Sequence, residues 1–318
     1  MPIHRVSAAC GGWTRSLVPQ LPGSARHLRA RQTRATNPAD YRSCLASGHR
    51  TPLTPANAHC PDCVWFRHVN SLLTSGELGE PCGLSVVMPA YEELPNLREV
   101  LPNVISVLSG ISGLTFEILV VLPVSVSTEE QEAVVGLGAI PVVRGPSNSF
   151  GDALRSGFAR ASTDSDFVVT LDADGSHDPV TIPVMLAAAP GADVVIGSRY
   201  VTGGSTDNSV MLRMMSKALN FAYGRVLGIA CHDISTNYKL YRRDDLSQID
   251  LECRDFDVVE EILFRLKALH GEAFKVVEVP DHFRERKHGE TKRRLGPFVV
   301  SYLGTLVRLR WQTRRRAS

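Results

Sequence analysis

Two aspartates separated by one alanine, Asp172 and Asp174, are the residues best suited to metal chemistry in this sequence. They follow the apolar run Phe167–Leu171, which has the composition of a buried strand, so both carboxylates stand at a strand end. If the backbone turns there, both can face one hard cation such as Mg²⁺ or Mn²⁺, which prefers carboxylate oxygens and substrate phosphates. A cation that bridges a diphosphate offsets charge on a leaving group. The same Asp-x-Asp-Gly-Ser composition also suits a solvated turn, so the motif alone leaves both interpretations open.

From Leu84 onward, short β-rich runs alternate with longer amphipathic stretches. The predicted strands of this first part are Leu84–Met88, Phe116–Leu122, Ile140–Val143, Phe167–Leu171 and Asp193–Ile196. The helices between them are Leu94–Leu108, Thr128–Leu137, Gly151–Arg160 and Pro179–Ala188. A helix Val210–Leu227, a strand Tyr238–Tyr241, a helix Asp257–His270 and a strand Ala273–Val279 follow. The alternation predicts an α/β fold of Rossmann-like type, with a mostly parallel sheet and helices on both faces.

Ligands of open α/β sheets bind beyond the carboxyl ends of the strands. Polar segments follow three of the predicted strands at that edge, namely Pro89–Glu93, Asp172–Asp174 and Gly197–Tyr200. The first strand is not followed by Gly-x-Gly-x-x-Gly, and the sequence has no P-loop. These absences argue against dinucleotide oxidoreductases and P-loop NTPases.

The composition limits the class of protein. The chain has 318 residues, 43% of them hydrophobic, which is enough to bury a sizeable core. No apolar run has the length of about 18 residues that a membrane-spanning helix needs. The net charge is +2, but the basic residues concentrate at the two ends and leave an acidic middle. An acidic middle argues against a general nucleic-acid surface.

The two ends differ from the middle, so we expect a domain over residues 81–292 and separate terminal segments. Residues 1–80 are rich in Arg and contain no Lys, and we expect a poorly ordered basic extension. Cys60 and Cys63 have half of a zinc-ribbon spacing, but a second cysteine pair is missing, which favours incidental thiols. The total of seven Cys is odd and fits a reducing cytoplasm better than a disulfide framework.

Residues 293–318 combine apolar positions at helical spacing with Arg at both ends, which predicts a basic amphipathic helix. Such a helix can lie in the headgroup plane of an anionic membrane, with about 1 kcal/mol from each basic side chain near the surface. It can equally pack on the domain's own surface or on a second subunit. A peripheral contact with the cytoplasmic membrane face is therefore one of two expectations for this segment.

Several segments resemble a known family when they are taken together and in order. They are SVVMPAYEELPNL from Ser85, LDADGSHDP from Leu171, VIGSRYVTGG from Val195 and VPDHFRERKHGETK from Val279. They resemble the successive motifs of the inverting glycosyltransferase family 2 with a GT-A fold, and within it the dolichyl- or polyprenyl-phosphate mannosyltransferase group. The resemblance extends from about Leu84 to Lys292.

The resemblance implies roles for individual residues. For the nucleotide-sugar donor it implies Pro89, Tyr91, Glu93, Asp172, Arg286 and Lys292, the last two as a clamp on the diphosphate. For the metal, Mg²⁺ or Mn²⁺, it implies Asp172, Asp174 and Ser176. For the phosphate of the lipid acceptor it implies Arg199, Arg213 and Ser216. It thus implies that Asp172, Asp174, Arg199 and Arg213 carry the catalysis. The planar fork of Arg and the point charge of Lys both suit phosphate oxygens, although each Arg taken singly also fits a surface salt bridge.

The function that follows is a metal-dependent, inverting transfer of a hexose, with mannose from GDP-mannose as the expected donor, to a polyprenyl phosphate. The attacking phosphate is already anionic, so no carboxylate base is required. A hydroxyl acceptor would need one, and Asp233, Glu260 and Glu261 are the candidates, although the two glutamates could equally form an exposed helix face.

Two departures from the family pattern keep other functions open. Leu122–Ser125 stands where the group has Asp-Asp-Gly-Ser, so both carboxylates expected to hold the nucleotide are missing. Ser235–Lys239 replaces the common Thr-Ser-Gly-Phe-Arg. The alternatives are a family 2 transferase with a soluble acceptor and a different donor, and a degenerate GT-A domain that binds without catalysing.

Overall fold

The computed structural model describes residues 82–286 and Thr305. The expected basic extension with Cys60 and Cys63, the donor residue Lys292, and the expected C-terminal helix apart from Thr305 lie outside the described residues. Within the described part, no helix combines the length and the hydropathy that crossing a bilayer requires.

A central sheet of seven strands organises the described part of the chain, in the order β3-β2-β1-β4-β7-β5-β8. Its strands are β1 (Cys82–Pro89), β2 (Leu114–Leu122), β3 (Ile140–Val143), β4 (Phe167–Thr170), β5 (Val194–Ser198), β7 (Lys239–Arg242) and β8 (Val276–Pro280). Only β7 runs antiparallel to its neighbours, β4 and β5. The predicted α/β fold with a mostly parallel sheet is therefore confirmed.

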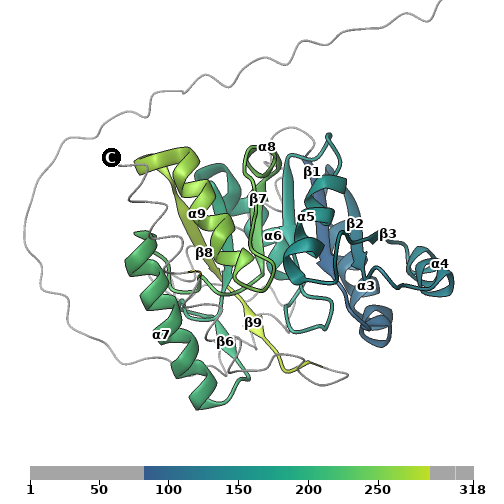
Figure 1. Ribbon diagram of the computed structural model, residues 1–318, viewed down its shortest axis with the longest axis horizontal. Coiled ribbons are helices and arrows are strands. Elements are labelled where there is room, and N and C mark those ends of the chain that lie inside the picture. The colour runs from purple at the N-terminus through teal and green to yellow at the C-terminus, as the bar shows by residue number, and fades with distance from the viewer. Residues whose placement is uncertain (1–81, 287–304, 306–318) are drawn as a thin grey trace, which may run out of the picture. The chain divides into compact units, whose positions relative to one another are not determined.

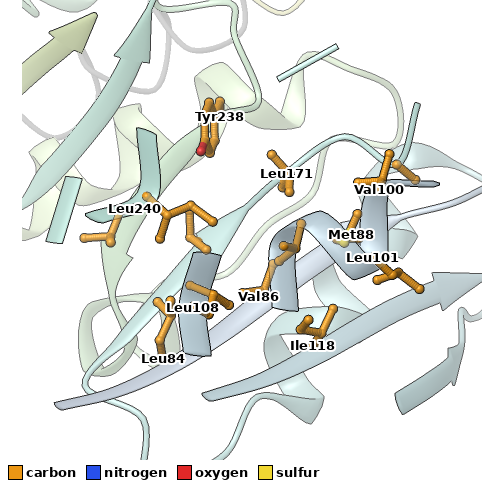
Figure 2. Close-up of a cluster of buried hydrophobic side chains, with 14 of the residues drawn as sticks. Leu84, Val86, Met88, Val100, Leu101, Leu108, Ile118, Leu171, Tyr238 and Leu240 are labelled. Carbon is orange, nitrogen blue, oxygen red and sulfur yellow. The ribbon is translucent and has the colours of Figure 1, made fainter. Parts of the chain in front are cut away.

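One face of the sheet is covered by α3 (Leu94–Ser109) and α6 (Thr181–Ala188). Alternate residues of β1, namely Leu84, Val86 and Met88, point to this face because successive side chains of a strand alternate between faces. Figure 2 shows them gathered with side chains of α3 and with Tyr238 and Leu240 from the antiparallel segment.

The other face is covered by α5 (Phe150–Arg160), α9 (Val258–His270) and the C-terminal end of α7 (Val210–Leu227) (Figure 1). Val87 of β1 and Leu119 and Val121 of β2 point to this side. Most residues of β1, β4 and β5 are buried, so the centre of the sheet is covered on both faces, as parallel sheets are. The polar loops that could carry out chemistry therefore lie at the carboxyl edge of the sheet.

Some short elements escaped prediction. They are α8 (Arg243–Ser247) and the small sheet of β6 (Ser205–Thr206) with β9 (His282–Phe283), whereas the helix predicted over Thr128–Leu137 is present as α4 (Thr128–Gly136). The strand expected from Ala273 begins later, because Gly271–Ala273 forms a 3-10 turn before β8. Elements of two to five residues show too little periodicity to be recognised.

The expectation that Glu260 and Glu261 could form an exposed helix face is wrong, because both are buried in α9. Glu261 accepts hydrogen bonds from the backbone N–H groups of Glu252 and Cys253 and from Arg265. Its role is therefore to hold the loop that precedes α9.

Close packing of α5 on the sheet predicts a strong effect at Gly157. A Cβ there would lie 2.3 Å from Cγ1 of Val87 and 3.2 Å from Cγ2 of Val121. We expect Gly157→Ala to lower the free energy of unfolding by about 1–3 kcal/mol, measured by urea denaturation, although Ala favours helices. The control is Gly136→Ala, whose Cβ would meet nothing within 4 Å, and which we expect to be neutral or slightly stabilising. Equal urea midpoints for the two variants would contradict this packing.

Candidate active site

The loop after β4 presents both predicted metal-binding aspartates at the carboxyl edge of the sheet. Gly175 has a φ of 78°, a conformation that glycine adopts without strain, and it turns the chain so that Ser176 N–H donates to Oδ1 of Asp174 at 3.0 Å. The side chains of Asp172 and Asp174 are each 22% exposed. Ser176 Oγ is buried and has no hydrogen-bond partner among the described residues. The loop therefore offers two carboxylates and one unsatisfied hydroxyl oxygen.

Asp172 is held by two residues that sequence reasoning did not assign. Asn237 Nδ2 donates to Oδ1 of Asp172 at 2.9 Å, and Nε2 of the buried His177 lies 3.4 Å from Oδ2. On its other side, His177 Nδ1 lies 3.2 Å from Oδ2 of Asp281. Burial alone would lower the pKa of His177, but the carboxylates of Asp172 and Asp281 outweigh it and raise this pKa to about 9. A positive charge therefore lies beneath the metal loop at neutral pH.

The segment after β8 crosses the metal loop and brings Arg286 into the site. Arg284 N–H donates to the carbonyl oxygen of Ser176 at 2.7 Å. Arg286 Nη2 then lies 2.8 Å from Oε1 of Glu93 and 3.3 Å from Oδ2 of Asp174. Glu93, Asp174 and Arg286, which were predicted to bind the donor or the metal, are far apart in the sequence but lie together here.

The residues of this corner fit a hard divalent cation. Carboxylate and hydroxyl oxygens are the ligands that Mg²⁺ and Mn²⁺ prefer, and the buried Ser176 hydroxyl lacks another partner among the described residues. A second group with metal-type spacing, Asp193, Asp245 and His270, has ligand atoms within 4.8 Å of one another. Asp193 precedes β5, so this group lies at the opposite edge of the sheet from the predicted metal loop.

The loops after β1 and β2 are joined by Arg144, which sequence reasoning missed. This buried guanidinium donates to the carbonyl oxygens of Ala90, Val121 and Leu122, which end the two strands. Its Cζ lies 6.0 Å from the centre of the Tyr91 ring, and that ring is 39% exposed. Arg144 therefore stabilises the loop after β2, which is the loop that lacks the two carboxylates expected from the family resemblance. An Arg directly after the predicted strand Ile140–Val143 was the available signal.

Arg199 lies in a second polar cluster, next to the metal loop. It forms a forked pair with Asp233, through Nε at 2.8 Å and Nη2 at 2.6 Å. Nη2 also lies 3.4 Å from Ser216 Oγ and 3.2 Å from Ser235 Oγ. Burial would raise the pKa of Asp233, but Arg199 outweighs it and holds this pKa below its usual value. Asp233 is therefore unsuited to take a proton from a hydroxyl acceptor.

The structure brings Arg199 and Ser216 together, whereas Arg213 is exposed on α7. Tyr200 lies between two cations, with Arg199 Cζ 5.1 Å and Lys217 Nζ 5.3 Å from its ring centre. Lys217 was not predicted. Lys217 supplies exposed positive charge at this cluster, because Asp233 already neutralises Arg199. Arg213 lies one helical turn earlier on α7.

The arrangement suits a reaction between two phosphate-bearing molecules. At one corner, oxygen ligands and Arg286 can hold a cation and a diphosphate. At the other, Ser216, Lys217 and Arg213 can hold a second phosphate. No strong base is needed if that phosphate is the nucleophile.

Known proteins with similar sequences carry consistent names. The chain is 33% identical over 223 residues to a polyprenol monophosphomannose synthase of Mycolicibacterium smegmatis, covering 65% of this chain and 79% of that protein. It is 32% identical over 237 residues to a dolichol-phosphate mannosyltransferase of Pyrococcus furiosus, covering 72% of this chain. The match spans 64% of the Pyrococcus protein, less than two thirds of its length.

Solved structures support the fold. Glucosyl-3-phosphoglycerate synthase from Mycobacterium tuberculosis, in complex with Mn²⁺, UDP and phosphoglyceric acid, superposes with a TM-score of 0.55. The sequence identity is 18%, and the superposition covers 83% of this chain and 84% of that one. The same enzyme with Mg²⁺ and UDP gives a TM-score of 0.53 at 18% identity, over 81% of this chain and 85% of that one.

The model of one protein family matches residues 85–250, which include the first loop, the metal loop, and the cluster around Arg199. This range contains more than half of the chain and most of the central sheet. Together with the relatives and the GT-A architecture, it shows that the chain belongs to glycosyl transferase family 2.

Proposed function

We propose that this chain transfers mannose from a nucleotide sugar, GDP-mannose, to a polyprenyl phosphate with the help of Mg²⁺ or Mn²⁺. The observation that carries the proposal is the meeting of Glu93, Asp174 and Arg286 beside Ser176 at the carboxyl edge of the sheet. The names of the relatives support a polyprenyl phosphate acceptor and a mannosyl group.

Asp172, Asp174 and Ser176 would hold the cation, and His177 and Asn237 orient Asp172 for it. When bound, the cation offsets the charge that grows on the departing diphosphate. Arg286 has a guanidinium group within reach of both Glu93 and Asp174, and it can turn part of this fork to the donor's diphosphate oxygens. Lys292, the other proposed donor residue, lies outside the described residues.

The acceptor phosphate attacks the anomeric carbon, so the residues around it must position an anion rather than remove a proton. Arg213, Ser216 and Lys217 all lie on α7. Ser216 contacts Arg199, and Lys217 lies beside the ring of Tyr200. Asp233 fixes the Arg199 fork and so keeps this wall of the site rigid. Inversion at the anomeric carbon follows from a single displacement.

We expect Asp172→Asn and Asp174→Asn each to lower kcat/KM by at least about a hundredfold, because each removes an anionic ligand and electrostatic stabilisation of the leaving group. The matched control is Asp193→Asn in the other metal-type group, which we expect to keep kcat/KM within about twofold. Turnover is measured after EDTA treatment and on readdition of Mn²⁺. Loss of Mn²⁺-dependent turnover only in Asp193→Asn would move the metal to the opposite edge.

A donor and acceptor panel tests the substrate assignment. We expect labelled mannose from GDP-mannose to enter the organic phase with polyprenyl phosphate. Label that stays in the aqueous phase with every polyprenyl phosphate would remove the lipid acceptor. Transfer from a UDP-sugar alone would instead show that the donor's nucleotide is UDP, and that the altered loop Leu122–Ser125 goes with a different base. Calorimetric titration that gives no heat with any donor and Mn²⁺ would support a non-catalytic domain.

The forked pair predicts a specific defect for Asp233→Asn. The substitution leaves the Arg199 charge buried without its counter-ion, and we expect a loss of about 3–5 kcal/mol in the free energy of unfolding. We expect Arg199→Met with Asp233→Leu to recover part of this loss, because no buried charge remains. Urea denaturation measures both variants. A double variant as unstable as Asp233→Asn would show that the pair contributes through more than charge balance.

A further inference from the structure

Strand β7 begins at the carboxyl edge of the sheet, because it runs antiparallel to both of its neighbours, β4 and β5. Its first residue, Lys239, is the register partner of Thr170, which ends β4, and of Ile196 in β5. Residues 234–238 therefore cross this edge between the loops that follow β4 and β5. We call residues 234–238 the linking segment.

The linking segment contacts both of the proposed binding places. Ser235 Oγ lies 3.2 Å from Nη2 of Arg199, in the cluster proposed for the acceptor's phosphate. Asn237 Nδ2 donates to Oδ1 of Asp172 in the metal loop at 2.9 Å. The donor and the acceptor must meet between these two places. The position of the linking segment therefore affects the distance between the reacting atoms.

Lys239 fixes the backbone of the linking segment from within the core. Its side chain is fully buried, and Nζ donates to the carbonyl oxygens of Ile234, at 2.8 Å, and of Thr236. Thr170 Oγ1 donates to the next carbonyl oxygen but one from Nζ's first partner, that of Asn237. The ammonium group therefore holds the stretch of backbone that carries both contacts described above.

A buried ammonium group is costly, so its presence at the start of β7 needs an explanation. Burial lowers the pKa of Lys239, but the fully buried carboxylates of Glu260 and Asp233 oppose the shift, and this pKa is about 8. An apolar side chain at this position would avoid the cost of desolvation. It would, however, leave the carbonyl oxygens of the linking segment without this donor.

We propose that Lys239 is a positioning residue for the transfer reaction, which sets the metal loop and the acceptor cluster at a fixed separation through the linking segment. The inference rests on the proposed function, because it takes the donor to bind beside Asp172 and the acceptor's phosphate near Arg199. Lys239 contacts neither substrate in this arrangement. It acts through Ser235 and Asn237.

Calorimetric titration of Lys239→Met with two probes tests the proposal. The probes are GDP with Mn²⁺ for the donor corner and farnesyl phosphate for the acceptor cluster. We expect Lys239→Met to weaken both affinities by about fivefold or more, because both contacts move with the linking segment. We expect kcat to fall by about a hundredfold, because the reacting atoms are misplaced. Ser235→Ala weakens only farnesyl phosphate, and Asn237→Gly only GDP with Mn²⁺, by about threefold each.

Gly157→Ala is the matched control for lost stability, because its effect arises where α5 packs on Val87 and Val121. We expect it to keep both affinities and kcat within about twofold of the wild type. Urea denaturation measures the stability of both variants. If Lys239→Met loses stability but keeps both affinities and kcat, the role of Lys239 is only structural and the proposal is wrong.

Lys239→Arg provides the test if Lys239→Met does not fold. The guanidinium group keeps the positive charge and the N–H donors, but its planar fork cannot direct them as an ammonium group does. We expect a folded protein whose kcat is about tenfold lower, with smaller losses in the two affinities. Unchanged kcat and affinities in this variant, when Lys239→Met is unfolded, would overturn the proposal.

The proposed function and the positioning role fail in different ways. If the wild type binds both probes but transfers no sugar, the proposed function is wrong, whereas a joint loss of both affinities in Lys239→Met still supports the positioning role. If the wild type transfers mannose and Lys239→Met transfers it equally well, only the positioning role is wrong. If the wild type binds neither probe, both are wrong.

Discussion

Repulsion among carboxylates at the carboxyl edge of the sheet is the constraint around which this site is built. Asp172 and Asp174 end one strand, Glu93 follows another, and Asp281 follows a third. Arg286 lies between Glu93 and Asp174, and protonated His177 lies between Asp172 and Asp281. The small sheet of β6 and β9 matters because it carries the segment that delivers Arg286. Folding thus brings these four carboxylates together with two cationic side chains, which reduce the electrostatic repulsion between the carboxylates.

The neighbouring cluster follows the opposite principle, because its charges cancel in the interior. Arg199 is matched by Asp233, and the fully buried Lys239 donates its Nζ hydrogens to the carbonyl oxygens of Ile234 and Thr236. Burial lowers the pKa of Lys239 to about 8, even though Glu260 and Asp233 oppose the shift. Lys239 is therefore still mostly protonated at neutral pH, and the exposed positive charge nearby lies on α7, at Arg213 and Lys217.

Local patterns were sufficient for most strands of the central sheet and for placing Asp172 and Asp174 at the end of a strand. The run Phe167–Leu171 and the aspartates after it are adjacent in sequence, so one hydrophobic stretch and one turn motif locate both. The pairing of Arg199 with Asp233 depends instead on β7 lying between β4 and β5, an order that no periodicity encodes. Arg144 was missed because its partners are backbone carbonyls. The exposed helix face expected for Glu260 and Glu261 was wrong because charged side chains are usually exposed, whereas these two are buried.

The antiparallel strand β7 has a consequence for how such a protein can diverge. The chain leaves the sheet after Ser198 of β5 and returns to it at Lys239, the first residue of the neighbouring strand β7. The excursion between these two residues includes α7, and it begins and ends at adjacent strands. Insertions or deletions within that excursion leave the register of the sheet unchanged. The loops that carry Asp172 and Asp174 and the segment that carries α7 can therefore change in length independently of each other on one scaffold.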